Sequence, residues 1–279
     1  MATAVSREVA LPTGFTMPSV GLGVYRSAPG QETYAAVLGA LRLGYRHIDT
    51  AQVYGNEADV GRAVRDSGVP REEVFVTTKV WRDAFGFEHA LASVRSSLAR
   101  SGLAYLDCAL LHCPGADPGR REGAWRGLEA AQAQGLVRTI GVSNFSPAHI
   151  AKLNRTAAVK PAVNQVEVHP WLQRRELVAA CRAEGIVVQA YSPLGKAARL
   201  SDPPLAAVAQ RLGVSPAQVL VRWSLQKGLV PLPKSVHPDR QASNLDVFSF
   251  SLSPEDVAAL DGLEEGLVTG WDPVAHDPV

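Results

Sequence analysis

One pattern recurs along almost the whole chain and restricts the fold more than any other feature. A short run of apolar and β-branched residues is followed by a polar turn and then by an amphipathic segment. Several of the apolar runs are nearly continuous rather than alternating, which is typical of strands covered on both faces of a parallel sheet. The eight runs span residues 20–25, 45–50, 74–80, 106–112, 138–143, 162–169, 186–192 and 229–233.

Strand–helix alternation repeated eight times in 279 residues predicts an α/β fold, a (β/α)8 TIM barrel formed by residues 1–279 as a single domain. Two helical patterns, at 203–212 and 216–227, precede the eighth run, so we expect extra helices near the C-terminal end. Residues 1–19 predict an N-terminal β-hairpin that caps one end of the barrel. An open doubly wound sheet is the rival fold, but Gly21 and Gly23 form a lone G-x-G without the third glycine of a dinucleotide-binding turn.

Several helix starts are marked by capping residues. Ser215 is followed by proline and then by Gln218 at the third helical position, which predicts a capping box. Ser146 and Ser253 repeat the Ser-Pro opening. Asn56 is expected to cap a helix that begins at the next residue.

Composition excludes several classes of protein. The chain is 46% hydrophobic and has a formal net charge of +1, which fits neither a disordered chain nor a nucleic-acid binder. No apolar run reaches the roughly 18 residues that a membrane span needs, and the first residues lack the layout of a signal peptide. Its three cysteines form no disulfide set and no zinc spacing, so we expect no metal. The prediction is a soluble cytoplasmic protein without nucleic-acid or membrane partners, and a monomer because nothing demands an interface.

Charged and polar side chains end several of the expected strands. In TIM barrels the working groups lie at these carboxyl ends. Asp49 and Lys79 end consecutive, neighbouring strands and can pair, Tyr54 follows Asp49 closely, and His112 ends the next strand. Taken singly, the first two could be a structural ion pair, the tyrosine could be packing, and the histidine could belong to the core. Together they indicate a reactive site.

At these residues the sequence resembles the aldo-keto reductase family. The resemblance continues in order over nearly the whole chain, and the short loops are most similar to the small bacterial 2,5-diketo-D-gluconate reductases. It rests on the segments DTAQVYGNE (49–57), TKVW (78–81), LHCP (111–114), GVSNF (141–145), NQVEVHP (164–170), YSPL (191–194) and PKSV (233–236).

The resemblance implies a catalytic group made of Tyr54, Asp49, Lys79 and His112. Tyr54 would donate the proton when a carbonyl is reduced, and His112 would orient the substrate oxygen. A free tyrosine has a pKa near ~10, and we expect the neighbouring Lys79 cation to lower it. Asp49 is expected to keep Lys79 charged.

The resemblance also implies that the cofactor is NADPH. Lys234, Ser235 and Arg240 would hold the 2′-phosphate, Tyr191 would stack on the nicotinamide, and polar groups after strands five and six would bind its carboxamide. From the residues alone, the loop after the eighth strand is a generic anion site, and Lys234 could be a solvated surface lysine. The full expected cofactor set is Gly23, Val24, Ser143, Asn144, Gln165, Tyr191, Ser192, Leu194, Lys234, Ser235, Val236, Arg240 and Asn244.

Tyr25, Trp81 and His112 are the expected walls of the substrate pocket, and Trp171 and the tail around Trp271 are also expected to set its reach. Glu167 and His169 are expected to support structure. The chain departs from the family pattern at two positions. Cys113 replaces a tryptophan, which should change one wall of the pocket, and Ser243 replaces a glutamate that helps to hold the adenosine part of the cofactor.

These features predict an NADPH-dependent reductase of aldehydes, ketones or diketo sugars, with a small-molecule carbonyl compound as its partner. A Schiff-base aldolase or isomerase that uses Lys79 as the nucleophile remains an alternative. A regulatory protein that binds NADP with little turnover is a third.

Overall fold

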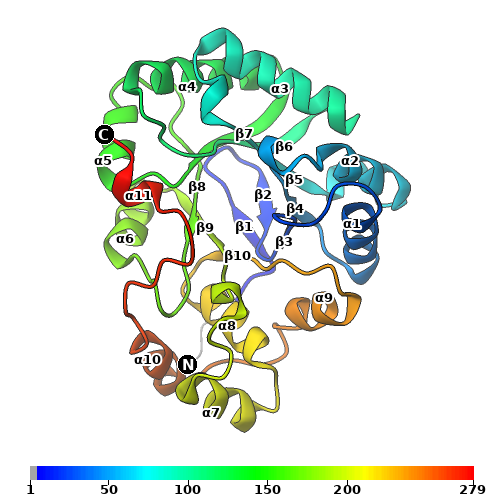
Figure 1. The fold of residues 1–279 in the computed structure, drawn as a ribbon, viewed down its shortest axis with the longest axis vertical. Helices are drawn as coiled ribbons and strands as arrows, with labels where there is room; N and C mark the ends of the chain where they lie inside the picture. Colours follow the sequence, from blue (N-terminus) through cyan, green and yellow to red (C-terminus); the bar gives the residue numbers. More distant parts are fainter. Residues whose placement is uncertain (1–4) are drawn as a thin grey trace.

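The chain folds around a ring of eight parallel strands, as a computed structural model that describes residues 5–279 shows (Figure 1). The strand order in the sheet follows the order along the chain, and each strand lies within one residue of an expected run. The (β/α)8 prediction is therefore confirmed. The strands are β3 (Leu22–Gly23), β4 (His47–Asp49), β5 (Phe75–Val80), β6 (Leu106–Leu111), β7 (Val137–Ser143), β8 (Val163–Glu167), β9 (Val187–Tyr191) and β10 (Val230–Leu232).

The seam between the first and last strands of the ring explains the isolated G-x-G. Gly23 forms a parallel bridge with Lys234, and its N–H donates to the Pro233 carbonyl oxygen at 3.1 Å. A Cβ on Gly23 would lie 3.1 Å from the Leu232 carbonyl oxygen, and one on Gly21 would lie 2.6 Å from the Leu232 side chain. These glycines let two backbones approach closely and close the barrel.

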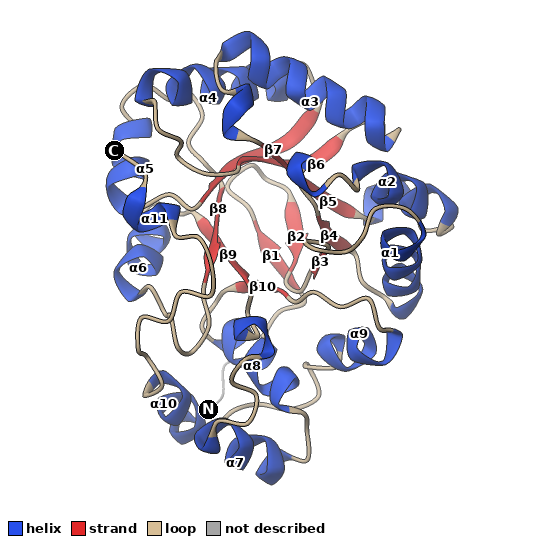
Figure 2. Cartoon of the chain, in the orientation of Figure 1, coloured by secondary structure: helices blue, strands red, loops and turns tan. Residues whose placement is uncertain are grey.

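Helices surround the strands on the outside of the ring (Figure 2). The two patterns expected before the last strand are α7 and α8, and further helices follow β10, as predicted. The helices are α1 (Gln31–Leu43), α2 (Glu57–Asp66), α3 (Phe87–Ser101), α4 (Pro118–Ala133), α5 (Pro147–Leu153), α6 (Arg175–Ala183), α7 (Pro203–Leu212), α8 (Pro216–Gln226), α9 (Pro238–Leu245), α10 (Pro254–Asp261) and α11 (Pro273–His276).

The predicted hairpin is formed by β1 (Glu8–Ala10) and β2 (Thr16–Pro18), which pair antiparallel. Met17 in β2 is fully buried and packs in one cluster with Phe75, Cys108 and Val230 from the barrel strands. The Pro18 carbonyl oxygen lies 3.3 Å from Nδ1 of His47, the first residue of β4. The hairpin thus closes the amino ends of the strands and leaves their carboxyl ends open.

The predicted capping box at Ser215 is present, the two other Ser-Pro helix starts also form capping boxes, and one predicted cap is wrong. Ser146, Ser215 and Ser253 each accept a hydrogen bond from the third helical residue. The helix α2 begins directly after Asn56, but the Asn56 side chain makes no cap. Its amide instead donates to the Val24 carbonyl oxygen at 3.1 Å, and its oxygen accepts from a threonine hydroxyl after β4. The fully buried amide joins the ends of two strands, because it faces the barrel rather than the helix start.

Within residues 5–279, no helix has both the length and the apolar character needed to cross a membrane.

Candidate active site

A cavity of about 680 Å³ opens at the carboxyl ends of the strands. Most of the predicted site residues line it, although they come from eight different strand ends and loops. The predicted residues in its lining are Gly23, Tyr25, Asp49, Tyr54, Trp81, His112, Ser143, Asn144, Gln165, Tyr191, Ser192, Leu194 and Lys234. The others lie behind or beside it: Lys79 and Val24 are buried beneath the floor, and Ser235, Val236, Arg240 and Asn244 lie on the segment that continues from Lys234.

Lys79 is the centre of the reactive group. Its Nζ lies 2.6 Å from Asp49 Oδ1, 2.9 Å from the Thr50 carbonyl oxygen and 3.4 Å from the Tyr54 hydroxyl. The side chain is completely buried, so all of its polar contacts are with these protein groups. Because β4 and β5 are neighbours in register, their ends bring Asp49 and Lys79 together as predicted.

The pKa of Tyr54 differs from the prediction. Burial and the negative charge of Asp49 raise the pKa of the phenol well above its usual value, whereas the sequence had suggested a lowered value. The pKa of Lys79 is lowered because burial outweighs the opposing effect of Asp49. We expected the Lys79 charge to lower the pKa of Tyr54, but desolvation has the larger effect. Desolvation depends on how the residues around Tyr54 pack. In this state the phenol keeps its proton at neutral pH.

His112 is held as a neutral imidazole above the phenol. Burial first and the Lys79 charge second move its pKa well below the usual value. Its ring lies edge-on to Tyr54, with centroids 5.8 Å apart, and to Trp81 at 5.1 Å. Among the described residues, its buried Nδ1 has no hydrogen-bond partner. Its carbonyl oxygen accepts from the Asn144 amide at 2.9 Å.

The polar groups expected to bind a carboxamide form a connected network. The Tyr191 hydroxyl donates to Asn144 Oδ1 at 2.9 Å, and Ser143 Oγ donates to the Gln165 carbonyl oxygen at 2.8 Å. The Gln165 amide nitrogen donates to Asp49 Oδ2 at 2.7 Å and to Gln189 at 2.8 Å. Both of its hydrogens are therefore used, so Gln165 presents its oxygen as the group for a further contact.

The predicted anion site lies where β10 continues into α9. Lys234 and Arg240 are exposed, and neither forms an ion pair with another described residue. Ser235 is buried, and its hydroxyl accepts from the backbone N–H two residues on, at 3.1 Å. Ser243, which replaces the family's glutamate, lies in α9 with its hydroxyl 3.3 Å from that of Ser215.

One expectation about the walls is wrong, and another agrees with the structure. Trp171 is buried, its Nε1 donates to Asp202 at 2.7 Å, and it does not line the cavity. Cys113 is also buried outside the lining, where its short side chain faces Asp277. Trp271 does line the cavity and packs 5.8 Å from Trp81.

Several lining residues were missed by the sequence prediction. Arg26 is next to the predicted Tyr25, and Lys196 is two residues beyond the predicted Leu194, so positive charge in the loops after these strands was an available signal. Thr269 and Gly270 carry no such signal, because a tail segment reaches the site only through contacts distant in sequence. The full missed set is Arg26, Val53, Glu167, Pro193, Lys196, Ala197, Leu232, Thr269 and Gly270.

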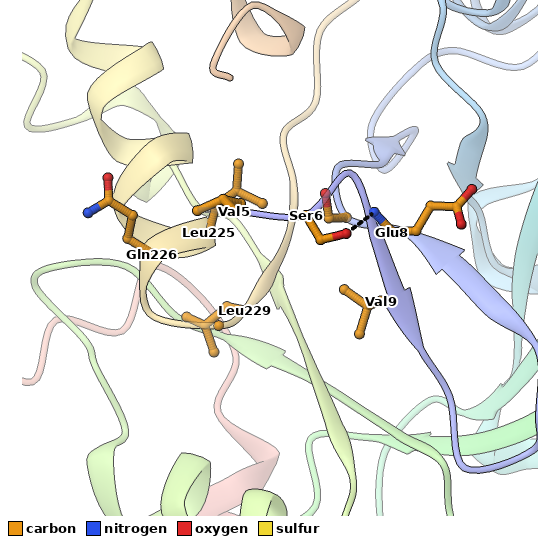
Figure 3. A pocket seen from close by; sticks show the side chains of 9 residues that line it. Val5, Ser6, Glu8, Val9, Leu225, Gln226 and Leu229 are labelled. Atoms are coloured by element: carbon orange, nitrogen blue, oxygen red, sulfur yellow. Dashed lines mark hydrogen bonds between the residues drawn. The ribbon is translucent and has the colours of Figure 1, made fainter. Parts of the chain in front are cut away.

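A second pocket, of about 390 Å³, lies near the closed end of the barrel, between the hairpin strand β1 and the turn from α8 into β10 (Figure 3). Glu8 is the one charged side chain among its described lining residues. Because none of these described residues is a cation, this pocket does not suit a phosphate. The cavity at the open end of the barrel is therefore the candidate site.

The match to a family agrees with this geometry. The model of the aldo/keto reductase family matches residues 19–265, and the chain belongs to that family. A Mycolicibacterium smegmatis protein named aldo-keto reductase is 44% identical over 96% of this chain and 98% of its own. A Bacillus subtilis protein named glyoxal reductase is 43% identical over 98% of both chains.

Solved structures are similar over the same length. An aldo-keto reductase from a deep-sea metagenome library has a TM-score of 0.92 and 37% identity, covering 97% of this chain and 100% of that chain. A Bombyx mori aldo-keto reductase, solved in complex with NADP, has a TM-score of 0.88 and 36% identity, covering 96% of this chain and 95% of that one. The chain is therefore an aldo-keto reductase. This family of oxidoreductases generally uses NAD(P)H.

Proposed function

We propose that the protein reduces aldehydes or ketones to alcohols with NADPH, and that Tyr54 donates the proton. The observation that carries the proposal is the placement of the Tyr54 hydroxyl, which lines the cavity and lies 3.4 Å from the Lys79 ammonium. A carbonyl oxygen that gains negative charge needs a donor at this point and positive charge behind it.

The protonation state of each side chain fits the role that we propose for it. A raised pKa keeps the proton on Tyr54 until a substrate oxygen accepts it. The Lys79 cation then stabilises the phenolate that remains, and Asp49, at 2.6 Å, holds the cation in place. Neutral His112 can donate a hydrogen bond to the carbonyl oxygen without competing as an acid.

The polar groups of the cavity suit the polar groups of NADPH. NADPH, when bound, supplies the hydride. The free oxygen of Gln165 suits a carboxamide N–H, and the face of Tyr191 suits a flat ring. Lys234, in the lining of the same cavity, and Arg240 beyond it suit a phosphate. A phosphate on the ribose is what distinguishes NADPH from NADH, so these two cations favour NADPH.

The substrate class follows from the remaining walls. Tyr25, Val53, Trp81 and Trp271 surround the approach to Tyr54 and are apolar or aromatic. Small aldehydes, α-dicarbonyl compounds and diketo sugars are the candidates, and the name of the B. subtilis relative, glyoxal reductase, supports the second group. A cytoplasmic location and a monomeric state stay predictions from the sequence.

Turnover of NADPH with a panel of aldehydes, α-diketones and keto sugars tests the proposal. We expect NADPH consumption that depends on the carbonyl compound and forms one equivalent of alcohol. Binding of NADPH without consumption by any member of the panel would favour the regulatory alternative. Borohydride trapping tests the aldolase alternative. Lys79 Nζ already contacts three protein groups, which disfavours its attack on a substrate carbonyl. A covalent adduct on Lys79 would overturn the hydride mechanism.

A further inference from the structure

The segment after α10 runs along one side of the ring, near β9 and β8, and reaches α11 beside α5 (Figure 1). We call residues 267–279 the closing segment. Its first anchor lies near Thr269, whose N–H donates to the buried Glu167 carboxylate at 3.2 Å and whose carbonyl oxygen accepts from Lys196. An ion pair of 2.6 Å between Arg174 and Asp272 adds to this anchor.

The second anchor joins the closing segment to the loop after β6. Asp277 Oδ2 accepts a hydrogen bond from the Gly115 N–H at 2.9 Å. The same carboxylate interacts with the Cys113 thiol, whose pKa burial and this negative charge raise to about 12. A tryptophan at position 113 would place a large ring where Asp277 approaches, so the cysteine leaves room for this contact.

Two buried side chains reinforce the second anchor. Arg121 in α4 is 2% exposed and donates to the Pro114 carbonyl oxygen at 2.7 Å and also to that of Pro278. His149 in α5 has its Nε2 3.1 Å from the carbonyl oxygens of Asp277 and Pro278. One guanidinium therefore binds both the loop and the closing segment, which makes this anchor a built site rather than a surface contact.

Two groups of the reduction site depend on this anchor. Cys113 directly follows His112, whose buried Nδ1 has no partner among residues 5–279, so the ring is positioned by its backbone and by ring packing. Trp271 lies between Thr269 and Asp272 on the same closing segment, and it packs against Trp81, which in turn packs against His112. A shift at Asp277 reaches the histidine through the loop and the indole through the closing segment.

We propose that Asp277 is a positioning residue for the reaction, joining the loop that follows His112 to the segment that carries Trp271. It touches neither substrate nor cofactor, and it acts by fixing the histidine that orients the carbonyl and the indole that walls the substrate. This inference rests on the proposed reductase function. The anion site around Lys234 is not part of the anchor, so cofactor affinity is independent of Asp277.

The test compares Asp277→Ala, Asp277→Asn and Val279→Ala with the wild type. Asp277→Ala removes the acceptor of the Gly115 N–H, so kcat/KM should fall roughly tenfold or more, while the dissociation constant of NADPH stays within about twofold. Asp277→Asn keeps a side-chain oxygen for that N–H and should recover most of the loss. Val279→Ala changes a side chain that is about half exposed and should behave as the wild type.

The readouts separate positioning from mere stability. A structural role would lower the melting temperature and the affinity for NADPH together and would leave kcat of the folded enzyme unchanged, and this result would overturn the proposal. Wild-type kinetics in Asp277→Ala would also overturn it. If the wild type itself consumes no NADPH with any carbonyl compound, the proposed function fails, and the role of Asp277 fails with it.

Discussion

At the scale of single residues, burial sets the chemistry of the site more strongly than neighbouring charge does. Lys79 and His112 were predictable from their positions at strand ends, and so was the pairing of Lys79 with Asp49. Tyr54 was predictable from its place in the turn that follows Asp49. The direction of the Tyr54 pKa was not predictable, because desolvation depends on the packing of walls contributed by distant parts of the chain. The neutral state of His112 has the same origin.

These pKa directions predict the pH dependence of reduction. In the proposed mechanism neutral His112 is the active form, and its pKa lies well below 6.5, so acid should not reduce kcat/KM near that pH. The same mechanism needs protonated Lys79, whose pKa is lowered from 10.5, so activity should fall as pH rises through a value below 10.5. Measurement of kcat/KM against pH checks both limbs. An inflection near 6.5 that disappears in His112→Asn would contradict the account.

At the scale of elements, strand ends and Ser-Pro helix starts were readable because they follow from local rules of periodicity and capping. The Asn56 side chain was misjudged for a tertiary reason. The buried Asn56 amide makes hydrogen bonds with Val24 and Thr50 at two strand ends, and these contacts replace a cap at the start of α2. Lys234, at the start of the β10–α9 loop, was placed correctly because its position depends only on the end of a strand.

The loop between β10 and α9 predicts a distinction between two cofactors. Lys234→Ala should weaken NADPH binding at least about tenfold and leave NADH binding within about twofold, because only NADPH carries the extra phosphate. Titration of both cofactors by fluorescence measures the two dissociation constants. Lys160→Ala, which removes a surface lysine paired with Glu184, is the matched control. Equal losses for NADPH and NADH would show that Lys234 does not bind the phosphate.

At the scale of the whole molecule, the barrel brings residues that are distant along the chain close together in space. Eight strand ends bring residues from Gly23 to Lys234 around one cavity, and the repeat in the sequence was sufficient to predict this. The closing segment was beyond such a prediction. Trp271 was expected at the pocket, but the contacts with Glu167 and Arg174 that hold its segment there follow no periodic pattern and needed the structure.

The measurement that tests the central claim most directly is hydride transfer from NADPH in Tyr54→Phe. This change deletes the hydroxyl that lies 3.4 Å from Lys79 and leaves the aromatic ring, so NADPH should bind as in the wild type. The rate of carbonyl reduction should fall by roughly 100-fold or more, the usual contribution of a positioned proton donor. Tyr34→Phe, which removes an exposed hydroxyl bonded to Asp66 in α2, should leave the rate unchanged. A Tyr54→Phe rate within a few-fold of the wild type would contradict the assignment of Tyr54 as the donor.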